Sequence, residues 1–352
     1  MNTWKEIKHK NYTVCLEEPT IYVDNQKRGR SGHMTHAMAE FQKNCLIDFN
    51  ANCSKERWEG HSPYGWVEYR ISCDSGKTYS EPEKLPYSWN CFLDGIYMIS
   101  VEKAVACEDG TIVAFCLRND GTNSTCCEPW NTPTVIRSTD GGKTWSEPLE
   151  YSPYPGRSYD ALIHDGVIYV MHFCNEHFLG TNPSHQYRIY TSTDNGKTFS
   201  ERSVIPFDTK GRGYSAMIFD EENVLHAYAY NVNAEQELDH AISCDFGKTW
   251  TLLPPCHLEK GIRNPQIALI DGVFVLHGRA GDLKGFVLYT SENAADWDEG
   301  LLVVPKEGVS AYYSNNVNLQ DDEGNFLLIQ YSDTYEGATK VNVMHMRLRI
   351  KK

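Results

Sequence analysis

One short pattern occurs four times in the chain and limits its possible folds more than any other feature. Each copy reads Ser-x-Asp-x-Gly-Lys-Thr followed by an aromatic residue, and the copies cover residues 72–79, 138–145, 192–199 and 243–250. In such a run the aspartate hydrogen-bonds the backbone of its own turn, the glycine supplies a positive φ, and the aromatic ring packs into the core. We therefore predict that each copy forms a tight turn between two β-strands.

The spacing of the copies indicates a repeated structural unit. They begin at Ser72, Ser138, Ser192 and Ser243, which gives steps of 66, 54 and 51 residues, and a degenerate fifth copy at 291–297 begins after a further 48. Repeats of roughly 40 to 50 residues that contain several strands are typical of β-propeller blades.

A second recurring pattern consists of two short apolar strands joined by a polar turn, often Asp-Gly, which is the signal of a β-hairpin. It occurs six times, at residues 33–49, 100–117, 159–172, 214–230, 265–278 and 314–331. Residues 12–23 precede the first hairpin and are expected to supply an outer strand of the last unit. The sequence therefore predicts an all-β, six-bladed propeller of four-stranded blades that forms a single domain over residues 1–352.

Composition narrows the functional classes. The net charge of −14 argues against nucleic-acid binding, which requires a basic face. The polar N-terminal residues 1–10 lack the apolar stretch of a secretory signal, and no apolar run is long enough for a membrane helix. We expect a cytoplasmic protein without a membrane partner. No phosphate loop, clustered metal ligands or calcium loop is visible, so we predict no cofactor and no metal; the sequence leaves the oligomeric state open.

Chemistry is expected where the segments leading into the innermost strands converge on one face of a propeller. Arginines recur in these segments, and a guanidinium group matches a carboxylate in a bidentate way. An arginine-lined, tyrosine-containing central pocket therefore predicts the binding of an acidic ligand. The candidate residues in these segments are Arg30, Glu102, Arg157, Asp160, Arg212, Arg263, Gln266, Tyr312 and Tyr313.

The repeated turn is an Asp-box, and the chain resembles the sialidase superfamily, whose catalytic members are six-bladed propellers. The resemblance in blade layout covers nearly the whole chain, whereas the catalytic matches cover three short segments. It implies that Arg30, ahead of the first hairpin, binds a sugar carboxylate. It implies the same role for Arg279, which ends an Asn-Pro-Gln, strand, Asp-Gly, strand run at 264–279. In the segment Tyr313-Ser314 it implies that Tyr313 is the nucleophile.

Two departures from that family concern proton transfer. The family places an acid/base aspartate just before its first Asp-box, where this chain has Tyr-Gly-Trp-Val-Glu-Tyr-Arg at 64–70, and the glutamate that activates the tyrosine is replaced by Asn264. A tyrosine without a base is a poor nucleophile at neutral pH, because its ordinary pKa is about 10. Histidine can serve as acid or base near neutrality. The replacement candidates include His36, His61, Glu102 and Asp160.

The sequence is consistent with three functions. The first is an exo-acting glycoside hydrolase of sialidase type that cleaves a terminal acidic sugar, sialic acid first, from an oligosaccharide or glycoconjugate. Arg30, Arg279 and one of Arg263, Arg212 or Arg157 would hold the carboxylate. The second is a lyase or hydrolase acting on a uronic acid with histidine and tyrosine as acid and base. The third is a non-catalytic glycan-binding propeller, because Asp-boxes lie on outer turns and do no chemistry.

Overall fold

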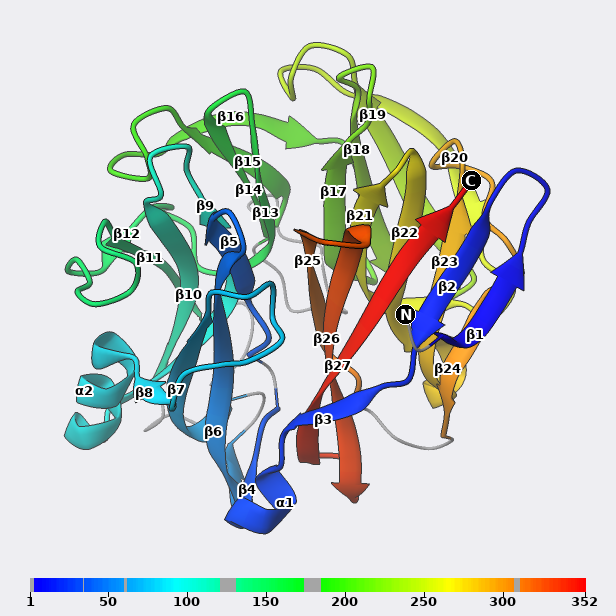
Figure 1. Ribbon diagram of the computed structural model, residues 1–352. Coiled ribbons are helices and arrows are strands. Elements are labelled where there is room, and N and C mark those ends of the chain that lie inside the picture. The colour runs from blue at the N-terminus through cyan, green and yellow to red at the C-terminus, as the bar shows by residue number, and fades with distance from the viewer. Residues whose placement is uncertain (1–2, 34, 60–61, 121–130, 174–184, 307–310) are drawn as a thin grey trace.

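Six β-sheets are arranged as blades around a central axis in the order of the chain (Figure 1). The computed structural model describes residues 1–352 apart from 1–2, 34, 60–61, 121–130, 174–184 and 307–310. The predicted all-β, six-bladed propeller is confirmed.

Blades two to five each contain four antiparallel strands in chain order, starting from the axis. Blade two contains β9 (Tyr97–Ala106), β10 (Ile112–Asp120), β11 (Thr132–Ser138) and β12 (Leu149–Glu150). Blade three contains β13 (Arg157–His164), β14 (Val167–Phe173), β15 (Tyr187–Ser192) and β16 (Ser200–Ile205). Blade four contains β17 (Arg212–Phe219), β18 (Leu225–Asn231), β19 (Glu237–Ser243) and β20 (Thr251–His257). Blade five contains β21 (Ile262–Ile270), β22 (Val273–Ala280), β23 (Gly285–Ser291) and β24 (Leu301–Pro305).

The first and last blades carry additional strands. Blade one contains β4 (Arg30–Ser31), β5 (Met38–Gln42), β6 (Cys45–Glu59), β7 (Ser62–Ser72) and β8 (Glu83–Lys84). Blade six contains β25 (Ser314–Asp321), β26 (Gly324–Glu336) and β27 (Lys340–Lys351), together with the N-terminal strands β1 (Thr3–Lys8), β2 (Thr13–Glu17) and β3 (Thr20–Val23).

The N-terminal strands close the ring. Strand β2 pairs with β27 in antiparallel register, with Val14 opposite Ile350, and β3 pairs with the other end of β27. The sequence predicted this closure from residues 12–23; β1 extends the same sheet by one strand. Both ends of the chain are therefore held in one blade, as Figure 1 shows.

The hydrophobic core lies between neighbouring blades. Six clusters of buried side chains each join two adjacent blades. Between blades five and six, for example, the rings of Phe286 and Tyr331 stack with centroids 4.4 Å apart. The innermost strands β5, β9, β13, β17, β21 and β25 pack in a ring, and each contacts the next. Apolar packing thus fixes the distance between the innermost strands and the axis.

The Asp-box turns join the third strand of a blade to the fourth, as predicted. In the second copy, Asp140 Oδ1 accepts from the Thr144 backbone N–H at 2.9 Å and from Ser138 Oγ at 2.8 Å. Its Oδ2 accepts from Thr144 Oγ1 at 2.6 Å. These hydrogen bonds, those from Thr144 above all, lower the pKa of Asp140 to about 2. The degenerate copy keeps the turn with Asn293, whose side-chain oxygen accepts from the backbone N–H of Asp296 at 2.8 Å.

Two short helices were not predicted from the repeats: α1 (Asn25–Arg28) and α2 (Pro86–Asp94). Helix α2 has its proline at the first helical position and ends at Gly95 with a φ of 73°, which are ordinary start and stop signals. In the described part of the chain, neither helix has the length and apolar character that a membrane span requires.

Candidate functional site

A cavity on the axis receives side chains from all six blades. Its lining combines residues from the start of the innermost strands with residues from the segments that lead into them. The lining residues are His36, Glu102, Arg157, Tyr159, Tyr214, Ser215, Asn264, Gln266, Tyr313, Ser314 and Asn315. The cavity volume is about 40 Å³, room for about three water molecules but not for a sugar ring. A sugar ring therefore enters only when side chains at the mouth move.

β-Bulges aim several of these residues at the axis. The register against the next strand shifts close to the start of β13, β17 and β21, and in the middle of β9. The residues that have no partner opposite them at these shifts include Glu102, Tyr159, Tyr214 and Asn264. All four line the cavity. A bulge turns a side chain out of the regular alternation of a strand. The same local distortion, repeated in four blades, builds much of the cavity wall.

Tyrosines form one side of the cavity. The hydroxyl oxygens of Tyr313 and Tyr214 lie 3.1 Å apart, and the Tyr214 ring meets that of Tyr159 edge-on at 5.5 Å. The Tyr313 ring also meets His33 edge-on at 4.9 Å. The predicted nucleophile thus lies in the cavity, with another phenol as the hydrogen-bond partner of its hydroxyl.

A buried ion pair joins Arg157 to Glu102, two of the predicted site residues. Arg157 Nη2 lies 2.6 Å from Glu102 Oε2, and both side chains are at least nine-tenths buried. The guanidinium group also lies 5.3 Å from the Tyr214 ring centre. A ligand carboxylate that approaches Arg157 therefore meets a guanidinium group that already holds a carboxylate.

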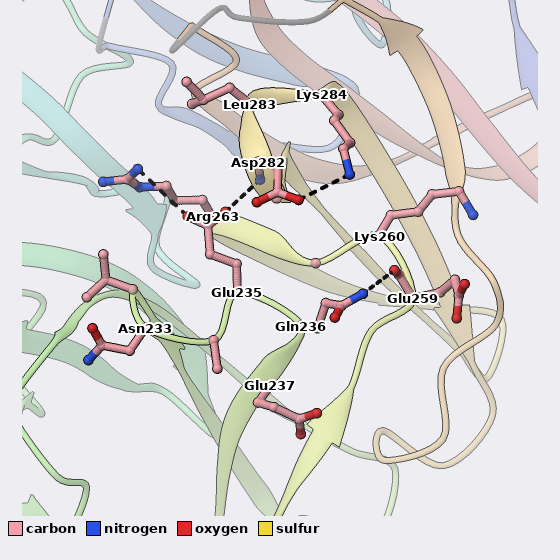
Figure 2. Close-up of a pocket in the computed structure, with 14 residues that line it drawn as sticks. Asn233, Glu235, Gln236, Glu237, Glu259, Lys260, Arg263, Asp282, Leu283 and Lys284 are labelled. Carbon is pink, nitrogen blue, oxygen red and sulfur yellow. Dashed lines mark hydrogen bonds and ion pairs between the residues drawn. The ribbon is translucent and has the colours of Figure 1, made fainter.

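Arg279 and Arg263 lie opposite each other on the paired strands β22 and β21. The guanidinium carbon of the buried Arg279 lies 6.0 Å from the Tyr313 ring centre, which places this predicted carboxylate ligand beside the predicted nucleophile. Arg263 instead lines a wider cleft between blades four and five, where its Nη1 lies 3.8 Å from Glu235 (Figure 2). Other side chains of that cleft are paired among themselves: Lys284 contacts Asp282 at 3.1 Å.

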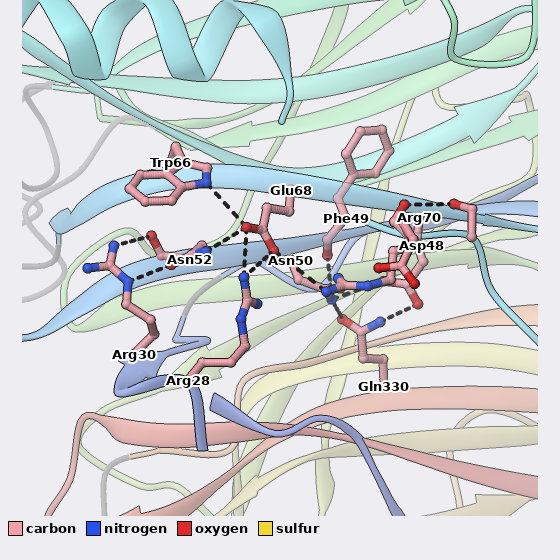
Figure 3. Close-up of polar contacts among 12 residues, drawn as sticks. Arg28, Arg30, Asp48, Phe49, Asn50, Asn52, Trp66, Glu68, Arg70 and Gln330 are labelled. Carbon is pink, nitrogen blue, oxygen red and sulfur yellow. Dashed lines mark hydrogen bonds and ion pairs between the residues drawn. The ribbon is translucent and has the colours of Figure 1, made fainter. Parts of the chain in front are cut away.

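Two predicted arginines lie away from the cavity lining. Arg30 donates to Asn52 through Nε at 2.5 Å and through Nη2 to its carbonyl at 2.9 Å, and its guanidinium group lies over the Trp66 ring (Figure 3). Arg212 forms a two-pronged ion pair with Asp239. Arg30 on β4 thus contacts the paired strand β6, and Arg212 on β17 reaches across β18 to β19 of the same blade.

The two other described acid/base candidates have different surroundings. His36 lines the cavity and is 3% exposed; burial lowers its pKa to about 4, although its hydrogen bond to the Gln330 side-chain oxygen opposes the shift. Asp160 lies deeper along the axis, where Lys103 contacts it at 2.9 Å and the Met217 backbone N–H donates to it at 2.8 Å. Those contacts join three blades, so they stabilise the ring.

The other predicted site residues are Gln266, Tyr312 and His61. Gln266 lines the cavity. Tyr312 has a φ of 74° and turns away from its neighbour Tyr313 into the core of blades five and six, where its hydroxyl donates to Asp333 at 3.0 Å. His61 lies outside the described residues.

The cavity lining also contains residues that were not named as candidate site residues: Tyr159, Tyr214, Ser215, Asn264, Ser314 and Asn315. A tyrosine follows two positions after Arg157 and after Arg212, and this spacing is the sequence signal that could have identified Tyr159 and Tyr214. Ser215 and Asn264 carry no comparable signal, because bulges set their direction.

Comparisons with known proteins agree with this architecture. Residues 136–147 match the family described as BNR/Asp-box repeat. No curated protein matches the sequence. A protein of unknown function from Dyadobacter fermentans has a similar structure, with a TM-score of 0.74 at 17% identity over 96% of this chain and 99% of that one.

Two sialidases also have similar structures. A variant of the NanB sialidase from Streptococcus pneumoniae aligns with a TM-score of 0.66 at 11% identity, over 94% of this chain and 70% of that one. The Trypanosoma rangeli sialidase, in complex with 2,3-difluorosialic acid as a covalent intermediate, aligns with a TM-score of 0.62 at 13% identity. That match covers 97% of this chain and 58% of the other. The TM-scores establish a shared fold.

Fold, repeat and cavity together define the class: this is a six-bladed Asp-box propeller with the sialidase fold. More particularly, the chain carries BNR/Asp-box repeats around an axial cavity that contains Tyr313, Tyr214, Arg157 and Glu102.

Proposed function

We propose that the protein is an exo-acting glycoside hydrolase of sialidase type that cleaves a terminal acidic sugar, with sialic acid as the first candidate. The observation that carries the proposal is the position of Tyr313. Its hydroxyl lies in the axial cavity within 3.1 Å of the Tyr214 hydroxyl, and the Arg279 guanidinium group lies beside its ring.

Arg279 and Arg157 are the arginines that we assign to the sugar carboxylate. Both are buried next to the tyrosine wall, where a guanidinium group binds a carboxylate more strongly than it does in water. The ligand carboxylate would share Arg157 with Glu102 or displace it. A carboxylate in this position leaves the anomeric carbon facing Tyr313.

The proposed reaction proceeds in two steps. Tyr313 Oη forms a bond to the anomeric carbon as the glycosidic C–O bond breaks, the phenol proton passes to Glu102, and an acid protonates the leaving oxygen. Water then attacks the same carbon and gives a proton to the conjugate base of that acid. The bond to Tyr313 breaks, and Glu102 returns its proton to the Tyr313 oxygen, which regenerates the phenol. Glu102 is the described carboxylate in the cavity lining, and His61 stays the predicted acid. Retention at the anomeric carbon follows from two displacements.

One observation favours a second candidate, elimination at a uronic acid. The Tyr313 hydroxyl is paired with a tyrosine, and Glu102 is already bonded to Arg157. In that reaction the arginines acidify the proton next to the carboxylate, and a tyrosine or His36 removes it. The two reactions differ in their products, because elimination adds no water.

Product masses separate the alternatives. The purified protein is incubated with sialyl and uronyl oligosaccharides, and the products are analysed by mass spectrometry. The proposal predicts released sialic acid with the mass of one water added across the two products. Products that sum to the substrate would indicate elimination. Binding of the oligosaccharides without any product would indicate a glycan-binding module. A Tyr313→Phe variant, which keeps the ring, is the matched control and is expected to lose turnover while it retains binding.

A further inference from the structure

A buried network between blades one and six determines the direction of each side-chain amide in it (Figure 3). The Asp48 carboxylate accepts from Gln330 Nε2 at 2.6 Å and from Asn50 Nδ2 at 2.9 Å. Both amide nitrogens therefore face Asp48. Gln330 Oε1 must therefore point away from Asp48. It accepts a hydrogen bond at 2.9 Å from Asn50 Nδ2, the same nitrogen that donates to Asp48.

This orientation fixes the tautomer of His36. Its Nδ1 lies 3.1 Å from Gln330 Oε1. A carbonyl oxygen can only accept, so Nδ1 carries the proton of the neutral imidazole and Nε2 is a bare acceptor. The ring stays neutral at pH 7, since burial holds the pKa of His36 near 4 and the nearby His345 acts in the same direction. Nε2 is buried and has no hydrogen-bond partner among the described residues.

Gln266 presents a second acceptor of fixed polarity in the same cavity. Its Nε2 donates to the Pro265 carbonyl at 2.9 Å, which leaves Oε1 as the free end of the amide. Oε1 is buried and, within the described part of the chain, has no donor. The side chain is 9% exposed. A buried acceptor without a donor is costly, so native proteins supply one from the protein, from water or from a ligand.

We propose that His36 Nε2 and Gln266 Oε1 are specificity determinants that each receive a hydrogen-bond donor, a hydroxyl or N–H group, from the bound sugar. This inference rests on the proposed function, because it assumes a sugar in the axial cavity. Both atoms are covered in the free protein, so the donors reach them as the cavity widens around the ligand.

The two fixed acceptor atoms, His36 Nε2 and Gln266 Oε1, orient the sugar in the site. A hydroxyl or amide N–H can donate to either atom, whereas a carboxylate, ketone or ether oxygen can only accept and is rejected there. The carboxylate of the sugar is thus directed to Arg157 and Arg279, and the hydroxyl-bearing part of the sugar is directed to His36 and Gln266.

The tautomer can be tested without any sugar. In a ¹⁵N-labelled sample of the full chain at pH 7, the long-range NMR signals of His36 are identified by their absence in a His36→Phe variant. We expect a protonated Nδ1 and an unprotonated Nε2. A protonated Nε2 would overturn the assignment of this atom as an acceptor.

The donor requirement is tested by calorimetry with 2-deoxy-2,3-dehydro-N-acetylneuraminic acid and its single-deoxy derivatives. The wild-type protein is expected to bind at least one derivative about 10-fold more weakly than the parent compound, the size of one lost hydrogen bond in a buried site. His36→Phe should bind the parent more weakly and lose its preference over that derivative, and Gln266→Leu should lose a preference over another. The control is His257→Phe, at an exposed position outside the cavity.

The outcomes separate this inference from the proposed function. Equal binding of all derivatives by the wild-type protein overturns the donor requirement, and this measurement does not depend on how a variant folds. Retention of the wild-type preference by a folded His36→Phe variant overturns the role of His36. If the wild-type protein binds neither the parent compound nor sialosides, the proposed function fails and the ligand contacts inferred here fail with it, while the NMR result still decides the tautomer.

Discussion

Glu102→Gln tests whether Arg157 receives the substrate carboxylate. In the free protein the Glu102 carboxylate holds Arg157 at 2.6 Å inside a buried site. Two carboxylates that share one guanidinium group lie roughly 5 Å apart, and at an effective dielectric constant of about 20 their repulsion is about 3 kcal/mol. Removal of the Glu102 charge relieves this repulsion. Part of the gain is lost because the neutral amide holds Arg157 less firmly in place.

We therefore expect the Kd of free sialic acid to fall between about 10-fold and about 100-fold in Glu102→Gln, measured by calorimetry. Turnover of a chromogenic sialoside should fall at the same time, since the variant lacks the proposed proton acceptor. Glu150→Gln is the matched control: it removes a carboxylate from the ion pair with Arg118, which lies outside the cavity lining. Unchanged or weaker binding of sialic acid by a folded Glu102→Gln variant would refute Arg157 as a carboxylate ligand.

Three further predictions concern stability and the tyrosine pair. The free energy of unfolding should decrease as the pH falls from about 6.5 towards 4, because the unfolded chain binds protons there that four buried histidines do not. Burial lowers the pKa values of these histidines to between about 3 and about 4; they are His36, His172, His240 and His277. A melting temperature that stays constant over this range would contradict that sign. The asp-box variant Asp140→Ala should lower the melting temperature and leave kcat unchanged; a loss of kcat at constant stability would contradict a purely structural turn. Tyr214→Phe should lower kcat by about 10-fold with little change in KM, because it removes the hydrogen bond to the attacking hydroxyl; an unaltered kcat would exclude that role.

The overall fold could be predicted because its signals are local and repeated. Each Asp-box is one turn whose hydrogen bonds lie within eight residues, and each hairpin has its own turn signal. Six repeats with alternating strands leave few arrangements other than a ring of blades. Helix α2 was missed because it lies in a connection between blades, where the repeat carries no information.

The candidate site was only partly predictable, because the direction of a side chain depends on strand register. Arg30 precedes the innermost strand β5 and Arg157 begins the innermost strand β13, yet Arg30 contacts Asn52 within its own blade and Arg157 lines the cavity. Tyr312 and Tyr313 are neighbours in the sequence, and the positive φ of Tyr312 sends it into the core. Asn264 reaches the cavity through a bulge that its sequence does not reveal.

The proposed function requires that Tyr313 attacks the sugar in the axial cavity. Incubation with 2,3-difluorosialic acid, followed by intact-mass measurement and peptide mapping, tests it directly, because the fluorine substituents slow the breakdown of a glycosyl–enzyme bond. We expect one adduct per chain on the peptide that contains Tyr313 and none in Tyr313→Phe. Release of sialic acid from a sialoside by an enzyme that forms no adduct, or that carries it on another residue, would rule out Tyr313 as the nucleophile.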